Sequence, residues 1–247
     1  RNTELLEKLE NKLDHINLLN ELRIICNTSF DSVSSFGQTD SMMVSYLKSK
    51  GFSSRNSDPH IIKEKYPGAY VHQPIPGAYD WITDFDFASL YPSIMITYNI
   101  GVNSFVMRTK DPHLGYDITY RPEALPKKIK MIIDPMYEKR EVEVASDELL
   151  KKIKESKLVS TINGCFFRPH KEELSVFGEV VDMLMTSRKT YKSKMFDAIE
   201  AKNEDEEKFY YTRQLVYKVL ANTLYGVVAN KAFRFFDTAL AGAITLS

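Results

Sequence analysis

Two long stretches with a helical pattern, joined by a short polar link, constrain the fold of this chain more than any other feature. The first covers about residues 174–200 and the second about residues 206–228. The link AKNED, residues 201–205, is short and polar, so we expect the two helices to fold back on each other. The sequence therefore predicts an antiparallel helical hairpin.

The N-terminal segment also has a helical pattern. Leucine and isoleucine recur at three- and four-residue steps over residues 4–27, which predicts a helix with one apolar face. A second helix is expected over about 39–49, and the Ser-, Gly- and Pro-rich residues 50–60 predict a loop.

Residues 61 to about 170 differ, because short apolar and aromatic runs alternate with Pro and Gly. We expect a buried strand at 81–87 and a short amphipathic helix at 147–157. Asn163-Gly164 lies between two strand-like runs at 159–168, which predicts a β-hairpin. Together with the helices, these elements predict an α+β fold.

The composition is that of an ordinary globular protein. The 247 residues are 43% hydrophobic and 27% charged, and the net charge is zero, so any basic surface must be local. Cys26 and Cys165 lie far apart without a CxxC pair, which argues against structural zinc and for reduced thiols in a cytoplasmic compartment. No apolar run has the length needed to span a membrane, and no signal peptide is evident.

The stretch DFDFASLYPSI, residues 84–94, has the pattern of a metal and phosphate site. Asp86 at the end of the expected strand can hold a divalent cation, and the backbone amides of the following turn can meet phosphate oxygens. The alternative is that Asp86 and Ser89 make ordinary turn and cap hydrogen bonds. Asp84 lies one alternation away on the same strand face, and we interpret it as structural.

The first long helix carries a basic run. Arg188 and Lys192 are four residues apart and share a face, with Lys189 and Lys194 nearby. Cations placed in this way can hold a triphosphate, Arg as a planar fork and Lys as a point charge. The alternative is a solvated helix surface.

The second long helix carries a polar stripe made of Gln214, Lys218, Asn222 and Tyr225. We expect this stripe to face a partner rather than solvent, with Lys218 neutralising charge on a phosphate and Tyr225 packing on a base or sugar. Gly226 leaves room for close approach to the backbone. The alternative is a partly exposed amphipathic face.

In combination, these stretches resemble the B-family DNA polymerases, and more closely those of large tailed phages of the T-even type. DFDFASLYPSI resembles the first palm motif DxxSLYPS, and KVLANTLYG (218–226) resembles the fingers motif Kx3NSxYG, with Thr223 in place of Ser. SRKTYK (187–192) is similar to the fingers stretch that holds the triphosphate, and YPGAYV (66–71) to a template-contacting segment.

The resemblance implies an incomplete palm, a mixed sheet with helices, and helical-hairpin fingers. It implies a lead-in at 1–60, the N-terminal part of the palm at 61–173, fingers at 174–230 and a truncated return toward the palm at 231–247. It also implies template-directed addition of dNTP to primer–template DNA by two-metal phosphoryl transfer with two Mg²⁺ ions.

The resemblance assigns roles residue by residue. Asp86 and Lys218 are the expected catalytic residues, and Tyr91 is expected to exclude a ribose 2′-hydroxyl. The metal ligands are Asp86 and the Phe87 carbonyl; the dNTP-binding residues are Ser89, Leu90, Tyr91, Arg188, Lys192, Lys218, Asn222, Tyr225 and Gly226; the template contacts are Tyr66 and Gly68.

The second carboxylate of this family comes from a hairpin motif, usually YGDTDS, that follows the fingers. FGQTDS (36–41) is similar, but Gln38 replaces the first Asp, the stretch precedes the first palm motif, and a helical pattern follows it. We interpret Thr39-Asp40-Ser41 as a helix N-cap. Asp237, which follows the fingers motif, is a weaker candidate that we interpret as structural.

The resemblance therefore implies a partner. The chain begins with Arg1 and lacks the second carboxylate motif, the thumb and the exonuclease motifs, so it is one of several assembling chains or a piece of a longer one. A second polypeptide would supply the rest of the palm and the thumb, and a further chain could carry the exonuclease. The apolar tail 238–246 would be exposed unless such a partner covers it.

Two rival functions stay open. The chain could be a noncatalytic module that binds nucleotide or primer–template, in which case Asp86 matters little and Arg188, Lys192 and Lys218 matter for nucleotide binding. It could also be a helical protein with fortuitous matches, which would have no nucleotide affinity.

Overall fold

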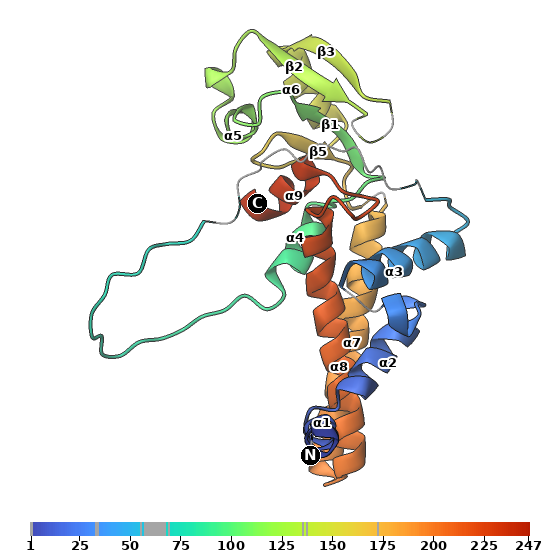
Figure 1. Ribbon diagram of the computed structural model, residues 1–247. Coiled ribbons are helices and arrows are strands. Elements are labelled where there is room, and N and C mark those ends of the chain that lie inside the picture. Colours follow the sequence, from blue (N-terminus) through green and yellow to red (C-terminus); the bar gives the residue numbers. More distant parts are fainter. Residues whose placement is uncertain are drawn as a thin grey trace. The chain divides into compact units, whose positions relative to one another are not determined.

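The computed structural model describes residues 2–32, 35–54, 56, 68, 70–134, 136, 138–171 and 173–247 (Figure 1). The chain divides into two compact units, and each is considered by itself. The helical unit comprises Arg1–Ile61 and Glu179–Phe236, and the sheet unit comprises Ile62–Gly178 and Asp237–Ser247. No helix within the described ranges is both long enough and apolar enough to cross a membrane.

The helical unit is built around the predicted hairpin, which is confirmed. Asn203 caps the second long helix, its side chain accepting a hydrogen bond from the Glu206 amide at 3.3 Å. Tyr191 and Tyr217 stack between the two long helices, which lie side by side in Figure 1, with ring centroids 5.4 Å apart. The elements of this unit are α1 (Asn2–Leu13), α2 (His15–Cys26), η1 (Phe30–Ser32), α3 (Ser35–Ser49), α7 (Val176–Glu200), which starts in the sheet unit, and α8 (Glu204–Val228).

The helix predicted at 4–27 exists but is broken in two. Asp14 adopts a left-handed conformation with φ 55°, which ends α1 and starts α2. The Glu10 carboxylate accepts from the Ile16 amide at 2.8 Å, which supports the break. The apolar stripe is not one buried face, because the α1 leucines are exposed whereas Leu22 and Cys26 of α2 are buried.

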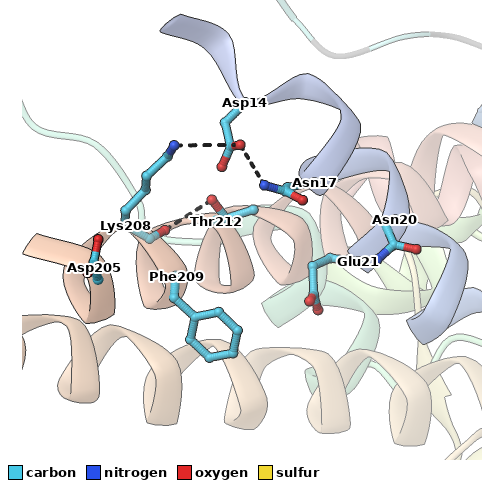
Figure 2. A pocket seen from close by; sticks show the side chains of 8 residues that line it. All are labelled: Asp14, Asn17, Asn20, Glu21, Asp205, Lys208, Phe209 and Thr212. Atoms are coloured by element: carbon cyan, nitrogen blue, oxygen red, sulfur yellow. Dashed lines mark hydrogen bonds and ion pairs between the residues drawn. The ribbon is translucent and has the colours of Figure 1, made fainter. Parts of the chain in front are cut away.

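Polar contacts hold α2 against α8. Lys208 Nζ reaches Asp14 Oδ1 at 3.6 Å, and Glu21 forms an ion pair with Arg213. Figure 2 shows the Lys208 contact at one end of a polar pocket of about 270 Å³, whose lining residues also include Asn17, Phe209 and Thr212. The two helices are therefore joined here by discrete ion pairs.

The sheet unit contains a five-stranded antiparallel sheet with the strand order β3-β2-β1-β5-β4, and the α+β class is confirmed. Its strands are β1 (Phe105–Thr109), β2 (Lys128–Ile133), β3 (Arg140–Ala145), β4 (Val159–Ser160) and β5 (Cys165–Phe167). Its helices are α4 (Leu90–Thr97), α5 (Leu114–Tyr120), η2 (Pro122–Ala124), α6 (Ser146–Glu155) and α9 (Thr238–Leu246).

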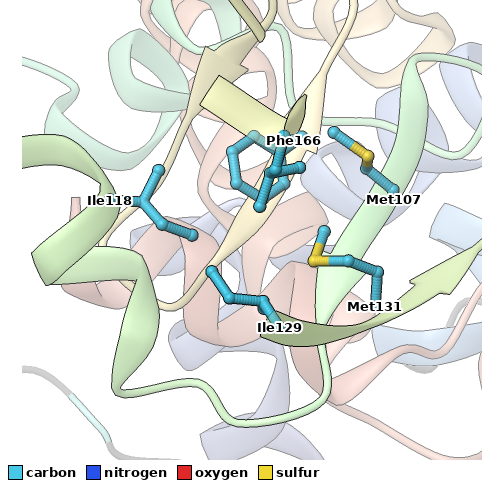
Figure 3. Close-up of a cluster of buried hydrophobic side chains, with 6 residues drawn as sticks. Met107, Ile118, Ile129, Met131 and Phe166 are labelled. Atoms are coloured by element: carbon cyan, nitrogen blue, oxygen red, sulfur yellow. The ribbon is translucent and has the colours of Figure 1, made fainter. Parts of the chain in front are cut away.

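Two of the local predictions for this unit, the β-hairpin at 159–168 and the helix at 147–157, are confirmed. The predicted hairpin is β4–β5, with Gly164 at φ 75° and the Gly164 amide donating to the Thr161 carbonyl at 2.9 Å. The helix predicted at 147–157 is α6. Figure 3 shows Met107, Ile118, Ile129, Met131 and Phe166 of the core between sheet and helices, to which Leu149 also belongs.

The prediction of a buried strand at 81–87 is wrong. Residues 82–87 have no regular secondary structure, and Trp81, Phe85 and Phe87 are 100%, 89% and 78% exposed. A strand needs a neighbour to take up its backbone hydrogen bonds. In the described part of the chain, none of the five paired strands includes this segment.

The prediction that the tail 238–246 would be exposed is also wrong. It forms α9, which packs against α4 and β5 and buries Leu240 and Ile244 completely. The Asp237 carboxylate caps α9 by accepting from the Ala239 and Leu240 amides at 2.8 and 2.9 Å. Asn163 of the β4–β5 hairpin donates to the Ala239 carbonyl at 2.8 Å. The tail therefore gives no argument for a covering partner.

Candidate functional site

The expected site residues belong to both units, so we describe them as two half-sets. The acidic half-set, Asp86, Phe87, Ser89, Leu90 and Tyr91, lies in the sheet unit. The basic half-set, Arg188, Lys192, Lys218, Asn222, Tyr225 and Gly226, lies in the helical unit. Of the expected template contacts, Tyr66 lies outside the described residues and Gly68 is exposed.

In the acidic half-set, Asp86 and Phe87 lie in the exposed segment just before α4. Ser89 occupies the N-cap position of α4 with φ 58°, but in the described structure its side chain makes no capping hydrogen bond, so the alternative of an ordinary cap does not hold for Ser89. Leu90 is exposed and Tyr91 is half-buried. The first amides of a helix lack partners within it and favour an anion, so this end of α4 can meet a phosphate group.

The oxygen donors here suit a hard cation, but they are few. The Asp86 carboxylate and the Phe87 carbonyl are the ligand types that Mg²⁺ takes. Within the described residues, no three His, Cys, Asp or Glu side chains are grouped to hold a metal. Because 81–87 is not a strand, the alternation that placed Asp84 on the same face as Asp86 does not apply.

On α7, Arg188 and Lys192 differ in their surroundings. Arg188 is half-buried, and its buried Nε has no hydrogen-bond partner in the described structure. A buried donor left unpaired is costly, so this nitrogen is ready for an anionic acceptor. Lys192 is exposed, with its ammonium 5.7 Å from the Phe196 ring centroid.

On α8, the polar stripe is more exposed than predicted. Lys218, Asn222 and Gly226 are exposed, whereas Gln214 and Tyr225 are half-buried. Because α8 packs within its unit through a different face, the expectation that the stripe faces a partner stays a prediction. Among the described residues, the space above Gly226 is open, since an added Cβ would meet none of their atoms within 4 Å. The buried face of α8 consists of Thr212, Val216, Leu220, Ala221, Leu224, Val227 and Val228.

Asp40 is structural, as predicted, but not as a cap. It lies inside α3, which starts at Ser35, so the prediction of an N-cap at Thr39-Asp40-Ser41 is wrong. Arg234 forms hydrogen bonds to the Asp40 carboxylate, with Nη2 donating to Oδ2 at 2.7 Å and Nε donating to Oδ1 at 2.8 Å. The hydrogen bond to Asp40 raises the pKa of Arg234.

Sequence reasoning missed Arg213, which links the basic half-set to α2. Its ion pair with Glu21 joins residues 192 positions apart, so no local signal marks it. Burial lowers the pKa of Arg213, but the hydrogen bond and charge of Glu21 outweigh burial and raise it overall.

Comparison with known proteins adds a family match. The sequence profile described as DNA polymerase family B matches residues 34–247. The chain is 26% identical over 209 residues to the DNA-directed DNA polymerase of Enterobacteria phage T4, and 28% identical over 248 residues to the DNA polymerase of Phaeocystis pouchetii virus. These alignments cover 75% and 95% of this chain but 22% and 23% of the relatives.

The fold is similar to that of the family B DNA polymerase from the hyperthermophilic archaeon Pyrobaculum calidifontis. The TM-score is 0.59 and the identity 23%, over 96% of this chain and 26% of that one. The chain thus spans about a quarter of the length of the proteins that it matches.

Proposed function

Because the chain belongs to DNA polymerase family B, we propose that it is the nucleotide-holding part of a DNA-directed DNA polymerase. In this proposal residues 61–173 and 231–247 are palm, 174–230 are fingers and 1–60 are the lead-in. The observation that carries the proposal is the exposed stripe of Lys218, Asn222 and Gly226 on α8. Beside it, α7 bears Arg188, whose buried Nε has no hydrogen-bond partner among the described residues.

The fingers hold the incoming nucleotide. Arg188, Lys192 and Lys218 neutralise the triphosphate, and Lys218 also offsets charge that develops on the phosphates during transfer. Asn222 positions the nucleotide, while Tyr225 and Gly226 lie beside the nascent base pair. Because these side chains come from two packed helices, their spacing is set before the nucleotide arrives.

The palm segment binds the other side of the nucleotide. Ser89 and Leu90 lie along the triphosphate through the amides that start α4, and Tyr91 lies under the sugar. Asp86 and the Phe87 carbonyl would hold Mg²⁺, which when bound activates the primer 3′-hydroxyl and steadies the leaving pyrophosphate. Tyr66 and Gly68 contact the template strand.

A second polypeptide segment completes the enzyme in this proposal. Two-metal phosphoryl transfer needs further carboxylates beside Asp86, and these come from the rest of the palm, together with the thumb. The exposed Trp81, Phe85 and Phe87 support this, because a run of large apolar side chains is a surface for another segment to cover. The assembled enzyme would work on primer–template DNA in the cytoplasm, that of the host if the source is a phage.

Primer extension and nucleotide binding test the proposal together. The chain alone, with Mg²⁺, primer–template and all four dNTPs, should give no extension, yet it should bind Mg²⁺·dTTP in calorimetry. Lys218→Ala and Arg188→Ala should each weaken binding about tenfold or more, since each removes a charge-assisted phosphate contact of about 1.5–3 kcal/mol. Lys231→Ala, an exposed lysine outside the set, is the matched control. Wild-type affinity that is unchanged by Lys218→Ala would contradict the proposal.

Because Asp86 is the one carboxylate that we assign to the metal in the described part of the chain, a second candidate is a noncatalytic nucleotide-binding or scaffold subunit. The two candidate functions predict different effects of a substitution at Asp86. In the assembled polymerase Asp86→Ala should abolish extension and leave assembly intact, whereas full extension by that variant would favour the noncatalytic role.

A further inference from the structure

Arg213 of α8 contacts side chains from three helices. Its Nη2 donates to Glu21 Oε1 of α2 at 3.2 Å, and its Nε lies 3.1 Å from Glu21 Oε2. Its Nη1 donates to the Tyr191 hydroxyl of α7 at 3.2 Å. The guanidinium also lies 4.4 Å from the centroid of the Phe209 ring. The side chains of Arg213 and Glu21 are only 29% and 16% exposed, so water screens this ion pair less than a surface pair.

Tyr191 lies where the phosphate-holding cations are. On α7 it is next to Lys192 and three residues from Arg188, and on α8 its stacking partner Tyr217 is next to Lys218. The two rings are nearly parallel, with an interplanar angle of 13°. An aromatic pair of this kind favours one lateral placement of the two helices and therefore one spacing of the cations.

We propose that Arg213, held by Glu21, is a positioning residue for the nucleotide site. It orients Tyr191, and the Tyr191–Tyr217 stack then sets the spacing between Arg188 and Lys192 on α7 and Lys218 on α8. In this way α2 braces the helical hairpin, and the cations meet the triphosphate without first having to be ordered. This inference rests on the proposed function of the basic half-set.

The chain offers a matched control at the same interface. Asp14 and Lys208 also join α2 to α8 (Figure 2), but none of the contacts that the described structure gives them reaches Tyr191 or Tyr217. If these contacts matter only because they hold α2 in place, substitutions at Glu21 and at Asp14 should have similar effects on nucleotide affinity. If Arg213 is a positioning residue, only the substitution at Glu21 should weaken nucleotide binding.

The first measurement is the dissociation constant of the whole chain for Mg²⁺·dTTP. We expect Glu21→Gln and Arg213→Gln to raise this dissociation constant about fivefold, which is typical of indirect coupling. Asp14→Asn should leave the constant within about twofold of the wild-type value. Tyr191→Phe keeps the ring stack but loses the hydroxyl, so its dissociation constant should lie between those of the wild type and Tyr191→Leu. Equal effects at Glu21 and Asp14, or wild-type affinity in Glu21→Gln, would overturn the proposal.

Amide hydrogen exchange without nucleotide separates this inference from the proposed function. Glu21→Gln should speed exchange across residues 187–194 of α7 about fivefold, and Asp14→Asn should not. Unchanged exchange in Glu21→Gln overturns the positioning role, whatever the nucleotide affinity. If the wild-type chain binds no Mg²⁺·dTTP but Glu21→Gln still speeds exchange in α7, the proposed function is overturned. The role of the Glu21–Arg213 pair in holding α7 then stands.

Discussion

Asp40 and Arg234 show how one residue can match a catalytic motif by its letters and serve another purpose. The carboxylate accepts three hydrogen bonds from the guanidinium, and Arg234 Nη1 also donates to Ser54 at 3.0 Å. With both charges engaged, Asp40 joins α3 to the segment that follows α8. A carboxylate held in this way is an unsuitable ligand for a catalytic metal.

Asp40→Ala should therefore lower stability and leave the site unaffected. Because it removes the carboxylate that accepts three hydrogen bonds from a half-buried guanidinium, we expect the free energy of unfolding to fall by about 1–3 kcal/mol. Urea unfolding measures this, with exposed Asp31→Ala as the control. The affinity for Mg²⁺·dTTP should stay at the wild-type value. A large loss of affinity would mean that Asp40 belongs to the nucleotide site.

Tyr91 carries a second prediction at this scale. If its ring lies under the sugar, Tyr91→Ala should admit ATP almost as well as dATP, reducing sugar discrimination by about tenfold or more, because a steric clash is removed. Tyr91→Phe keeps the ring and should keep the discrimination. The ratio of the two dissociation constants is the measurement, and an unchanged ratio in Tyr91→Ala would count against the role.

At the scale of elements, the correct predictions rest on signals within a few residues of each other. Asn163-Gly164 marks the β4–β5 turn, and the hairpin of α7 and α8 follows from the short polar link between them. The prediction of a strand at 81–87 is wrong because a strand depends on a neighbour that its own residues cannot specify. The Glu21–Arg213 pair was missed for a similar reason, since its members are close only after folding.

Gly164 supplies the prediction for an element. Its φ of 75° disfavours a side chain, and a Cβ added there would overlap the Thr109 hydroxyl of β1. Gly164→Ala should therefore destabilise the sheet unit by about 2–4 kcal/mol, combining backbone strain with overpacking. Gly51→Ala is the matched control, because Gly51 has φ 79° but an added Cβ would meet no described atom within 4 Å, and it should cost only about 1–2 kcal/mol. Equal losses of stability in urea would show that packing against Thr109 adds nothing.

At the scale of the whole molecule, each compact unit contains one of the two cysteines, and both are buried completely. Burial raises the pKa of Cys26 to about 12, and burial, followed by the charge of Asp237, raises that of Cys165 as well. The reactive thiolate is therefore nearly absent from the folded chain at neutral pH. Each thiol reports on the integrity of its own unit.

Thiol chemistry gives the last prediction. At about pH 8, Ellman's reagent should react with neither thiol of the folded chain and with both in urea. Since the unfolded thiols ionise near their ordinary pKa of about 8.5 and the folded ones do not, the unfolded state releases protons as pH rises. Stability should thus be full below about pH 8 and fall by up to about 1.4 kcal/mol per pH unit per thiol toward pH 12. Cys26→Ser and Cys165→Ser assign the signal to one unit each, and fast labelling of either thiol in the folded chain would mean that its unit is open.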